Sequence, residues 1–317
     1  MILGTRGSPL AVAQSGWVRD RLRQATPGLE IDTIVIRTTG DQQQASPPDT
    51  FFGAPGGATD KGIFVKEIEE ALLEGRIDLA VHSLKDLPTD QPAGLVIAAL
   101  PSREDPRDVL VTREGTGFDA LPRGARLGTG SPRRAAQLRL ARPDLVIEPV
   151  RGNVDTRVRR MREGRFDGVV LAAAGLSRLG MLKAGALEGA AAVPIAVEIC
   201  MPAVGQGALA IETRHDDAGA RAAAGAIADE DTRREITAER AFLAALGGGC
   251  RVPVAALARM HAGGELWLRG VVAAPDGSAC LRVDRRGAAE RAEELGQWLA
   301  KDAMDRGAGR LLGTPAD

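Results

Sequence analysis

The sequence predicts an α/β protein made of two related lobes and a smaller α+β domain at the C-terminal end. A turn that begins with Gly-Thr and ends with Ser-Pro occurs twice, at residues 4–9 and 128–132. An echo of the form Glu-Gly-Arg-x-Asp also occurs twice, at 74–78 and 163–167. After about residue 216 the pattern changes to an alanine-rich helix followed by candidate antiparallel strands. With 317 residues the chain is long enough for two or three domains.

Each Ser-Pro pair is expected to begin a helix. Ser8 and Ser131 suit the N-cap position, and Pro9 and Pro132 suit the first helical position. After the first pair, apolar residues recur near helical spacing as far as Leu22. Each Glu-Gly-Arg-x-Asp echo is expected to end a helix at its glycine and to lead into a buried strand.

Further strand candidates lie between these signals. They alternate with helical segments, as parallel sheets require, which indicates the α/β class. The candidates span residues 31–37, 95–100, 108–112 and 145–150. The stretch 42–60 is rich in Gln, Pro, Gly and Ala and has no periodicity, so it is predicted to be a surface loop. A tolerated insertion and an active-site lid fit it about equally well.

The C-terminal part is predicted to be a separate α+β domain. Its helix, residues 231–246, ends at a run of glycines. The expected strands and closing helix cover 252–258, 265–272, 279–284 and 288–312, with a Pro-Asp-Gly turn at 275–277. The predicted division of the chain is 1–101 with 198–215 for lobe 1, 102–197 for lobe 2 and 216–317 for this domain.

Composition narrows the class of protein. With 41 basic and 42 acidic residues the net charge is −1, which argues against a general nucleic-acid binder. The 3 cysteines, at 200, 250 and 280, form no Cys-x-x-Cys pair, so neither disulfides nor a zinc knuckle is expected. The 3 histidines lack metal-ligand spacing, and no metal is predicted. No signal-peptide pattern or membrane-length apolar run occurs, so a cytoplasmic protein without a membrane partner is expected.

Arginines accompany the predicted helix starts and strand ends. A helix start offers unpaired backbone N–H groups, and neither turn has the P-loop or dinucleotide-binding order, so ATP and NAD are disfavoured. Taken alone, each turn is only a capped helix start. Arg6, Arg133 and Arg134 favour a carboxylate site, because guanidinium groups bind carboxylates with paired hydrogen bonds. Arg151 and Arg178 each directly follow an apolar strand candidate, where ligands of open α/β sheets bind.

The segment His-Ser-Leu-Lys-Asp-Leu-Pro at 82–88 follows another buried strand candidate. Asp86 is its best acid–base candidate, since a carboxylate beside Lys85 can stay ionised, be tuned by burial and stabilise a cation. A Lys-Asp turn on the surface is the alternative interpretation.

A single thiol, Cys250, lies in the run Leu-Gly-Gly-Gly-Cys-Arg-Val-Pro at 246–253. A lone cysteine is usually an inert small hydrophobe. The three glycines before it nevertheless leave room for a bulky group beside the sulfur. The residues alone leave both interpretations open.

Six motifs occur in order along nearly the whole chain. They are Thr-Arg-Gly-Ser-Pro-Leu-Ala at 5–11, Lys-Gly-Ile-Phe-Val-Lys-Glu at 61–67, Val-His-Ser-Leu-Lys-Asp-Leu-Pro at 81–88, Arg-Glu-Asp-Pro-Arg-Asp at 103–108, Arg-Gly-Asn-Val at 151–154 and Gly-Gly-Gly-Cys at 247–250. In these motifs the sequence resembles the hydroxymethylbilane synthase family, whose members are also called porphobilinogen deaminases. The resemblance implies two lobes, similar to those of periplasmic binding proteins, around a cleft, and a third domain that delivers Cys250.

The resemblance also implies a cofactor and a reaction. Cys250 would hold a dipyrromethane through a thioether, and the enzyme would make this cofactor from its own substrate. Porphobilinogen loses ammonia to give an electrophilic methylene pyrrolenine, which the free α-carbon of the growing chain attacks. Four additions precede hydrolytic release of hydroxymethylbilane. Every pyrrole ring carries acetate and propionate, which arginines and helix N-termini would bind. We expect a monomer that acts on porphobilinogen, with no nucleic-acid partner.

Matching motifs imply roles for individual residues. Asp86, with Lys85, is the expected catalytic group, because it matches the aspartate that holds pyrrole N–H groups and stabilises their positive charge. The expected cofactor contacts are Cys250, Ser83, Lys85, Asp86, Ser131, Arg133 and Arg134. The expected substrate contacts are Arg6, Ser8, Lys61, Phe64, Arg151, Arg157 and Arg178. Two departures from the family pattern, the longer loop at 42–60 and the turn Gly-Thr-Gly-Ser-Pro-Arg-Arg at 128–134, remove none of these groups.

Two other functions compete with this one. A two-lobed anion-binding module would use the same lobes without chemistry, but it needs neither Cys250 nor a buried acid such as Asp86. A cysteine nucleophile with a histidine base is disfavoured, because no motif assigns a histidine to Cys250.

Overall fold

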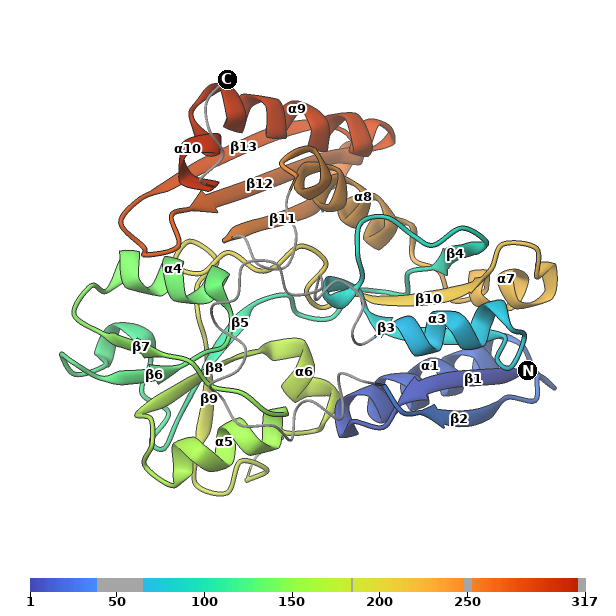
Figure 1. The fold of residues 1–317 in the computed structure, drawn as a ribbon, viewed down its shortest axis with the longest axis horizontal. Helices are drawn as coiled ribbons and strands as arrows, with labels where there is room; N and C mark the ends of the chain where they lie inside the picture. The colour runs from blue at the N-terminus through green and yellow to red at the C-terminus, as the bar shows by residue number, and fades with distance from the viewer. Residues whose placement is uncertain (39–64, 184, 248–252, 313–317) are drawn as a thin grey trace. The chain divides into compact units, whose positions relative to one another are not determined.

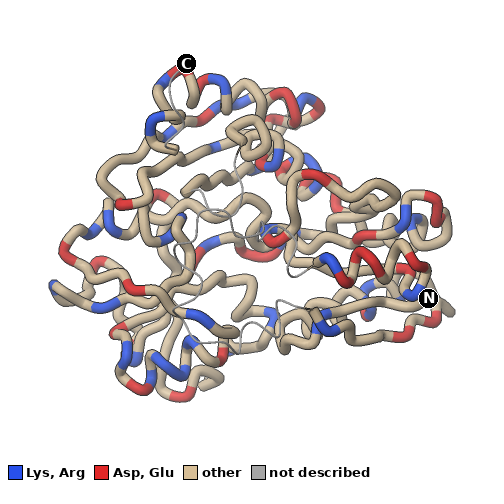
Figure 2. The backbone as a smooth tube through the Cα atoms, in the orientation of Figure 1, with Lys and Arg blue, Asp and Glu red and all other residues tan. Residues whose placement is uncertain are grey.

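The computed structural model describes residues 1–38, 65–183, 185–247 and 253–312 (Figure 1). Contacts within the chain define two compact units, and each is described by itself. The first unit contains residues 1–103 and 208–233, and the second unit contains residues 104–207 and 234–317. Basic and acidic residues are interspersed along the described chain, in keeping with the net charge of −1 (Figure 2).

The first unit is built on a five-stranded sheet with the order β2-β1-β3-β10-β4. Its strands are β1 Ile2–Arg6, β2 Asp32–Ile36, β3 Leu79–Ser83, β4 Leu95–Ala99 and β10 Leu209–Arg214. Its helices are α1 Pro9–Ala25, α3 Lys66–Leu73 and α7 Ala218–Gly225, with a short 3₁₀ helix η2 at Leu84–Asp86. Leu79 and Val81 of β3 pack with α1 and α7, whereas Ala80 packs with α3. Because neighbouring residues of a strand face opposite sides, these helices cover the two faces of the sheet.

The second unit has a five-stranded sheet of the same design, with the order β7-β6-β8-β5-β9. Its strands are β5 Asp108–Thr112, β6 Arg126–Gly128, β7 Val146–Glu148, β8 Gly168–Ala172 and β9 Ala191–Pro194. Its helices are α4 Pro132–Ala141, α5 Val154–Arg162 and α6 Ala173–Arg178, with the 3₁₀ helix η3 at Phe118–Ala120. Val169 packs on the side of α5, and Val170 packs on the side of α4, so this sheet is also covered on both faces.

The two sheets confirm the predicted α/β class and the predicted relation between the lobes, but their strands are not all parallel. In each sheet three strands are parallel, β2-β1-β3 and β7-β6-β8. The next strand in each order, β10 or β5, is antiparallel to its neighbours. Both of these strands begin directly after the chain enters their unit, at residues 208 and 104. They arrive without the helical crossover that a parallel partner requires.

The local signals that predicted helix ends are confirmed. Ser8 caps α1 by accepting a hydrogen bond from the Ala11 amide at 3.3 Å. Ser131 caps α4 in the same way, from the Arg134 amide at 3.4 Å. After α3 and α5 the glycines of the two echoes take positive φ values of 70° and 83°, which end these helices.

The C-terminal residues of the second unit form the predicted antiparallel sheet beside helices. The sheet has the order β11-β12-β13, with β11 Val254–His261, β12 Glu265–Ala273 and β13 Cys280–Ala288. The helices are α8 Glu230–Ala245, α9 Ala292–Asp305 and α10 Ala308–Leu312, and 3₁₀ helices lie at Ala262–Gly264 and Ala289–Arg291. Phe242 of α8 is fully buried in the core between sheet and helices.

Two of the predicted helices are each divided. The alanine-rich segment after residue 216 forms α7 and α8, and α7 lies in the first unit. The closing helix forms α9 and α10, which are separated at Gly307 with a φ of 94°. Within the described residues, no helix is both long and apolar enough to cross a bilayer.

Candidate functional site

In the first unit, the predicted cofactor residues stand at the carboxyl end of a buried strand. Strand β3 lies between β1 and β10, and Ser83 is its last residue. The buried Leu84 begins η2, and its amide donates to the Ala208 carbonyl at 3.1 Å. The backbone that carries Lys85 and Asp86 is therefore anchored to the sheet.

A hydrogen-bonded pair fixes the Ser83 side chain. The Ser83 hydroxyl accepts from Gln14 Nε2 at 2.9 Å and lies 3.1 Å from Gln14 Oε1, to which it can donate. Gln14 belongs to α1 and is only 4% exposed. Sequence reasoning missed this residue, although a polar side chain at a core position of a helix was a signal for it.

Asp86 is exposed and Lys85 is partly exposed. The expectation that burial tunes the Asp86 carboxylate is therefore wrong. The buried polar side chain of this segment is His82, whose Nε2 lies 3.1 Å from Oε2 of the buried Glu212 on β10. His82 precedes Ser83 and points to the opposite face of the sheet, toward α3.

Arg6 and Ser8 lie at the same edge of the first unit's sheet as Ser83. Strands β1 and β3 are parallel neighbours, with Gly4 paired to Ala80, so their carboxyl ends meet at one edge. Arg6 ends β1, and Ser8 begins the helix that follows. The first unit thus collects two hydroxyl groups, two basic groups and the Asp86 carboxylate at this edge.

In the second unit, the predicted residues occupy the corresponding edge. Ser131, Arg133 and Arg134 start α4 directly after β6. Arg151 follows β7, and Arg157 lies in α5. Because β6, β7 and β8 are parallel, these residues share the carboxyl edge of their sheet.

Arg178 lies in the second unit, but it does not directly follow a strand as predicted. The six-residue helix α6 follows β8, and Arg178 is its last residue. Its guanidinium donates to the Gly207 carbonyl at 2.7 Å. Burial, opposed by Glu104, lowers the pKa of Arg178 to about 10, so the group stays charged at neutral pH.

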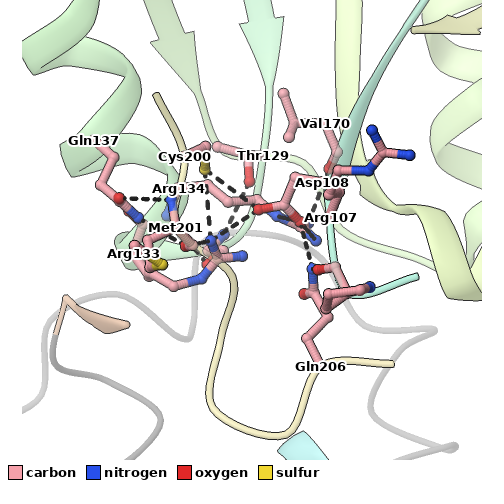
Figure 3. A network of polar contacts seen from close by, with 12 residues as sticks. Arg107, Asp108, Thr129, Arg133, Arg134, Gln137, Val170, Cys200, Met201 and Gln206 are labelled. Atoms are coloured by element: carbon pink, nitrogen blue, oxygen red, sulfur yellow. Dashed lines mark hydrogen bonds and ion pairs between the residues drawn. The ribbon is translucent and has the colours of Figure 1, made fainter. Parts of the chain in front are cut away.

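Arg133 and Arg134 are more deeply buried than ligand-binding surface residues would be, at 5% exposure each. Both pair with the fully buried carboxylate of Asp108 at the start of β5 (Figure 3). Arg133 Nη1 lies 2.8 Å from Oδ2, and Arg134 donates through Nε and Nη2 to Oδ1 at 3.0 and 2.7 Å. The cluster also contains the neutral side chains of Gln137, Cys200 and Gln206.

Electrostatics keep this cluster charged. Burial would raise the pKa of Asp108, but the two guanidinium groups outweigh it and hold that pKa well below its usual range. The neighbouring carboxylate outweighs the desolvation of Arg133 and raises the pKa of its guanidinium. Burial, together with Asp108, raises the pKa of Cys200 to about 12, so Cys200 is a thiol at neutral pH and not a nucleophile. Sequence reasoning placed Asp108 in a motif but gave it no role.

Three predicted site residues, Lys61, Phe64 and Cys250, lie outside the described residues, as does the loop at 42–60. Among the residues that are described, no group of three or more His, Cys, Asp or Glu side chains is arranged to hold a metal ion.

The fold and the two basic sheet edges define a class of protein: a two-lobed α/β protein suited to ligands with several carboxylates. A family model described as porphobilinogen deaminase, dipyromethane cofactor binding domain, matches residues 1–222. A second, described as porphobilinogen deaminase, C-terminal domain, matches residues 233–305. The chain belongs to the porphobilinogen deaminase family.

Full-length relatives carry the same name. The porphobilinogen deaminase of Syntrophus aciditrophicus (strain SB) is 48% identical over 312 residues, which cover 98% of this chain and 97% of the relative. That of Roseiflexus sp. (strain RS-1) is 50% identical over 312 residues and 98% of each chain. The predicted family, transferase activity and dipyrromethane cofactor are confirmed, and porphobilinogen is the substrate of this family.

Solved structures give only distant likenesses. The periplasmic VFT2 domain of Bordetella pertussis BvgS matches 71% of this chain and 86% of its own at 14% identity, with a TM-score of 0.41. A periplasmic binding protein of Salmonella typhimurium with high arginine specificity matches 74% of this chain and 93% of its own at 16% identity, with a TM-score of 0.39.

Proposed function

We propose that Cys250 carries the dipyrromethane as a thioether, and that the carboxyl edges of the two sheets bind the acetate and propionate groups of cofactor and substrate. The observation that carries this proposal is the buried cluster in which Arg133 and Arg134 share the single carboxylate of Asp108. Two guanidinium groups against one carboxylate leave a net positive charge, which an acidic group would neutralise.

The residues present fit an acidic, pyrrole-based group. Ser131 and the N-terminus of α4 supply hydroxyl and backbone donors beside Arg133 and Arg134. At the other unit's edge, Ser83 is oriented by Gln14, and Asp86 is exposed. The hydroxyl, backbone and guanidinium donors can bind the carboxylates of such a group, and the Asp86 carboxylate can accept hydrogen bonds from its pyrrole N–H groups.

Roles follow for the remaining residues. The cofactor contacts are Ser83, Lys85, Asp86, Ser131, Arg133 and Arg134, and the substrate contacts are Arg6, Ser8, Lys61, Phe64, Arg151, Arg157 and Arg178. Bound dipyrromethane supplies the primer to which porphobilinogen units are joined. Four porphobilinogen molecules are added head to tail with loss of ammonia, and hydrolysis releases hydroxymethylbilane.

Asp86 is the proposed catalytic carboxylate. An ionised carboxylate accepts hydrogen bonds from pyrrole N–H groups and stabilises positive charge that develops on the rings. Lys85, its neighbour in η2, is the proposed contact for a ligand carboxylate beside it.

The proposal extends to the state of the protein in the cell. We place it in the cytoplasm as a monomer, without nucleic acid. Cys200 and Cys280 are free thiols, which is the usual condition in a reducing compartment. The proposed domain boundaries remain 1–101 with 198–215, 102–197 and 216–317.

The mass of the denatured protein tests the attachment. Wild-type protein is expected to exceed its sequence mass by one dipyrromethane, whereas Cys250→Ser is expected to carry no adduct. Cys280→Ser is the matched control, because Cys280 is also a free cysteine but lies in β13 with no assigned role. An unmodified wild-type mass together with full turnover would contradict the attachment.

The same preparations test Asp86. Asp86→Asn is expected to retain the adduct but to lose turnover by about a hundredfold or more, the usual size of a lost transition-state contact. Asp90→Asn, which alters another exposed carboxylate four residues away, is expected to leave turnover unchanged. Equal turnover in both variants would remove Asp86 from the catalytic role.

A further inference from the structure

The Asp108 cluster has a composition that an ordinary structural ion pair does not require. Asp108, Arg133 and Arg134 are all buried, and the described chain supplies no second carboxylate to either guanidinium. The other partners are the Cys200 thiol, the Gln137 and Gln206 amides and backbone carbonyl oxygens. The cluster therefore keeps one unit of positive charge in a buried place, where an uncompensated charge is costly.

The hydrogen bonds show which group sets the orientation of the arginines. Oδ1 of Asp108 accepts from Arg134 Nε, Arg134 Nη2 and Gln206 Nε2 at 3.0, 2.7 and 2.9 Å. Oδ2 accepts from Arg133 Nη1 at 2.8 Å and from the Cys200 thiol at 3.3 Å. Both carboxylate oxygens are thus fully used within the protein.

The arginines, in contrast, keep donors that the cluster does not use. Among the described residues, the side-chain hydrogen bonds of Arg133 all run through Nη1, to Asp108, to Cys200 and to the Met201 carbonyl (Figure 3). In the described part of the chain, Nε and Nη2 of Arg133 have no hydrogen-bond partner, and neither is among the buried polar atoms that lack one, so this edge of the guanidinium reaches solvent. These two donor groups, on a side chain otherwise held inside the protein, are available to a ligand that the polypeptide does not supply.

We propose that Asp108 is a positioning residue of the cofactor site: it holds both guanidinium groups in place and leaves their excess charge and the free edge of Arg133 for one carboxylate of the pyrrole ligand. The proposal rests on the proposed cofactor contacts of Arg133 and Arg134. Asp108 itself touches no ligand, since its oxygens are occupied by protein donors.

A purely structural role is the competing interpretation, because the cluster also binds the segment at 200–206 through Gln137 and Gln206. The test therefore separates loading from stability. Asp108→Asn, Asp108→Glu, Cys200→Ser and Leu145→Ala are prepared without cofactor and given porphobilinogen, and adduct formation is followed by the mass of the denatured protein. Thermal unfolding of each variant is recorded in parallel.

We expect Asp108→Asn to load at least about tenfold more slowly than wild type, the effect of losing a charge-assisted contact. Asp108→Glu keeps the charge but moves the carboxylate, so it is expected to load at an intermediate rate. Cys200→Ser preserves a donor to Asp108, and Leu145→Ala destabilises the core of the same unit without removing a polar group of the cluster, so both are expected to load normally. Normal loading by a folded Asp108→Asn or Asp108→Glu would overturn the proposal, as would slow loading by Leu145→Ala.

Arg133→Gln and Arg134→Gln distinguish this proposal from the one on which it rests. If both load normally, the arginines are not cofactor contacts and the proposed site is wrong. If they fail to load while Asp108→Asn loads normally, only the role of Asp108 is wrong. Should neither Asp108 variant fold, the Nε–H signal of Arg134 in ¹⁵N-arginine spectra decides. The same chemical shift in the loaded protein and in the Cys250→Ser variant, which carries no cofactor, supports a guanidinium that is in place before the cofactor binds. A different chemical shift in Cys250→Ser overturns the proposal.

Discussion

The Ser83–Gln14 pair shows how a single residue on a helix can determine the direction of a site residue. Ser83 ends a strand and is partly exposed, so its hydroxyl would otherwise rotate freely. Gln14 is buried and presents both halves of its amide to that hydroxyl, at 2.9 and 3.1 Å. The pair therefore couples α1 to the edge where Lys85 and Asp86 stand.

We predict that replacing Gln14 by Leu destabilises the first unit by about 1–2 kcal/mol, because the Ser83 hydroxyl loses its partner. Ser83→Ala should leave the Gln14 amide unsatisfied at a similar cost. The double variant should cost less than the sum, with a coupling of about 1 kcal/mol measured by urea unfolding. Strictly additive costs would show that the two side chains do not interact in solution.

At the same scale, sequence reasoning identified the arginines but not their surroundings. Arg133 and Arg134 were found from their place after a helix start, which is a local signal. Their pairing with Asp108 joins residues 25 and 26 positions apart, and no spacing rule on one helix or strand reveals such a contact. Asp86 illustrates the converse: its position was predictable, but its exposure was not.

At the scale of elements, the turn between β6 and α4 depends on a close approach of two backbone segments. A Cβ atom on Gly130 would lie 2.8 Å from the Val150 carbonyl oxygen, which precedes Arg151. The turn at Gly130 and the backbone at Val150 therefore approach so closely that only a residue without a side chain fits between them. The same contact explains why a residue with a side chain is not accommodated between Thr129 and Ser131.

We predict that Gly130→Ala destabilises the second unit by about 1–3 kcal/mol, the usual cost of forcing an atom into a filled space. Gly16→Ala is the control, since a Cβ added in the interior of α1 would meet no atom within 4 Å beyond its chain neighbours and the nearby backbone of the helix. That variant should be more stable by about 0.5–1 kcal/mol, because alanine favours the helix. Thermal unfolding measures the change in stability of each variant. Changes of the same sign in both would show that the close approach at Gly130 does not destabilise its alanine variant.

At the scale of the whole molecule, the repeated motifs were a true sign of repeated architecture. The strand orders β2-β1-β3-β10-β4 and β7-β6-β8-β5-β9 correspond position by position. In each sheet, the chain passes from the other unit shortly before it forms the fourth strand, β10 or β5. The parallel strands could be predicted, because each is followed by its own helix signal. The antiparallel strands could not, because their direction depends on where the chain crosses between units, and no local pattern of β5 or β10 records that crossing.

The units should also differ in their response to acid, because the second unit contains the buried Asp108 cluster. The guanidinium groups hold the pKa of Asp108 far below the value of about 4 that an unfolded aspartate has. Stability from this shift is complete above about pH 4 and is lost as the pH falls toward the folded-state pKa, since the unfolded chain then binds the proton more readily. We expect the second unit to lose at most about 2 kcal/mol of unfolding free energy between pH 4 and pH 2 through this group.

Tryptophan fluorescence can follow each unit separately. Trp17 lies in the first unit, and Trp267 and Trp298 lie in the second, so Trp17→Phe leaves only signals of the second unit. In urea titrations of that variant, adding Asp108→Asn should lower stability at pH 7, because a buried charge pair is broken. The difference between the two proteins should narrow as the pH falls, since the unfolded parent binds a proton at Asp108 and is stabilised, whereas the Asp108→Asn variant has no carboxylate there to protonate. A difference that stays constant from pH 7 to pH 2 would show that Asp108 is not the group whose ionisation stabilises this unit.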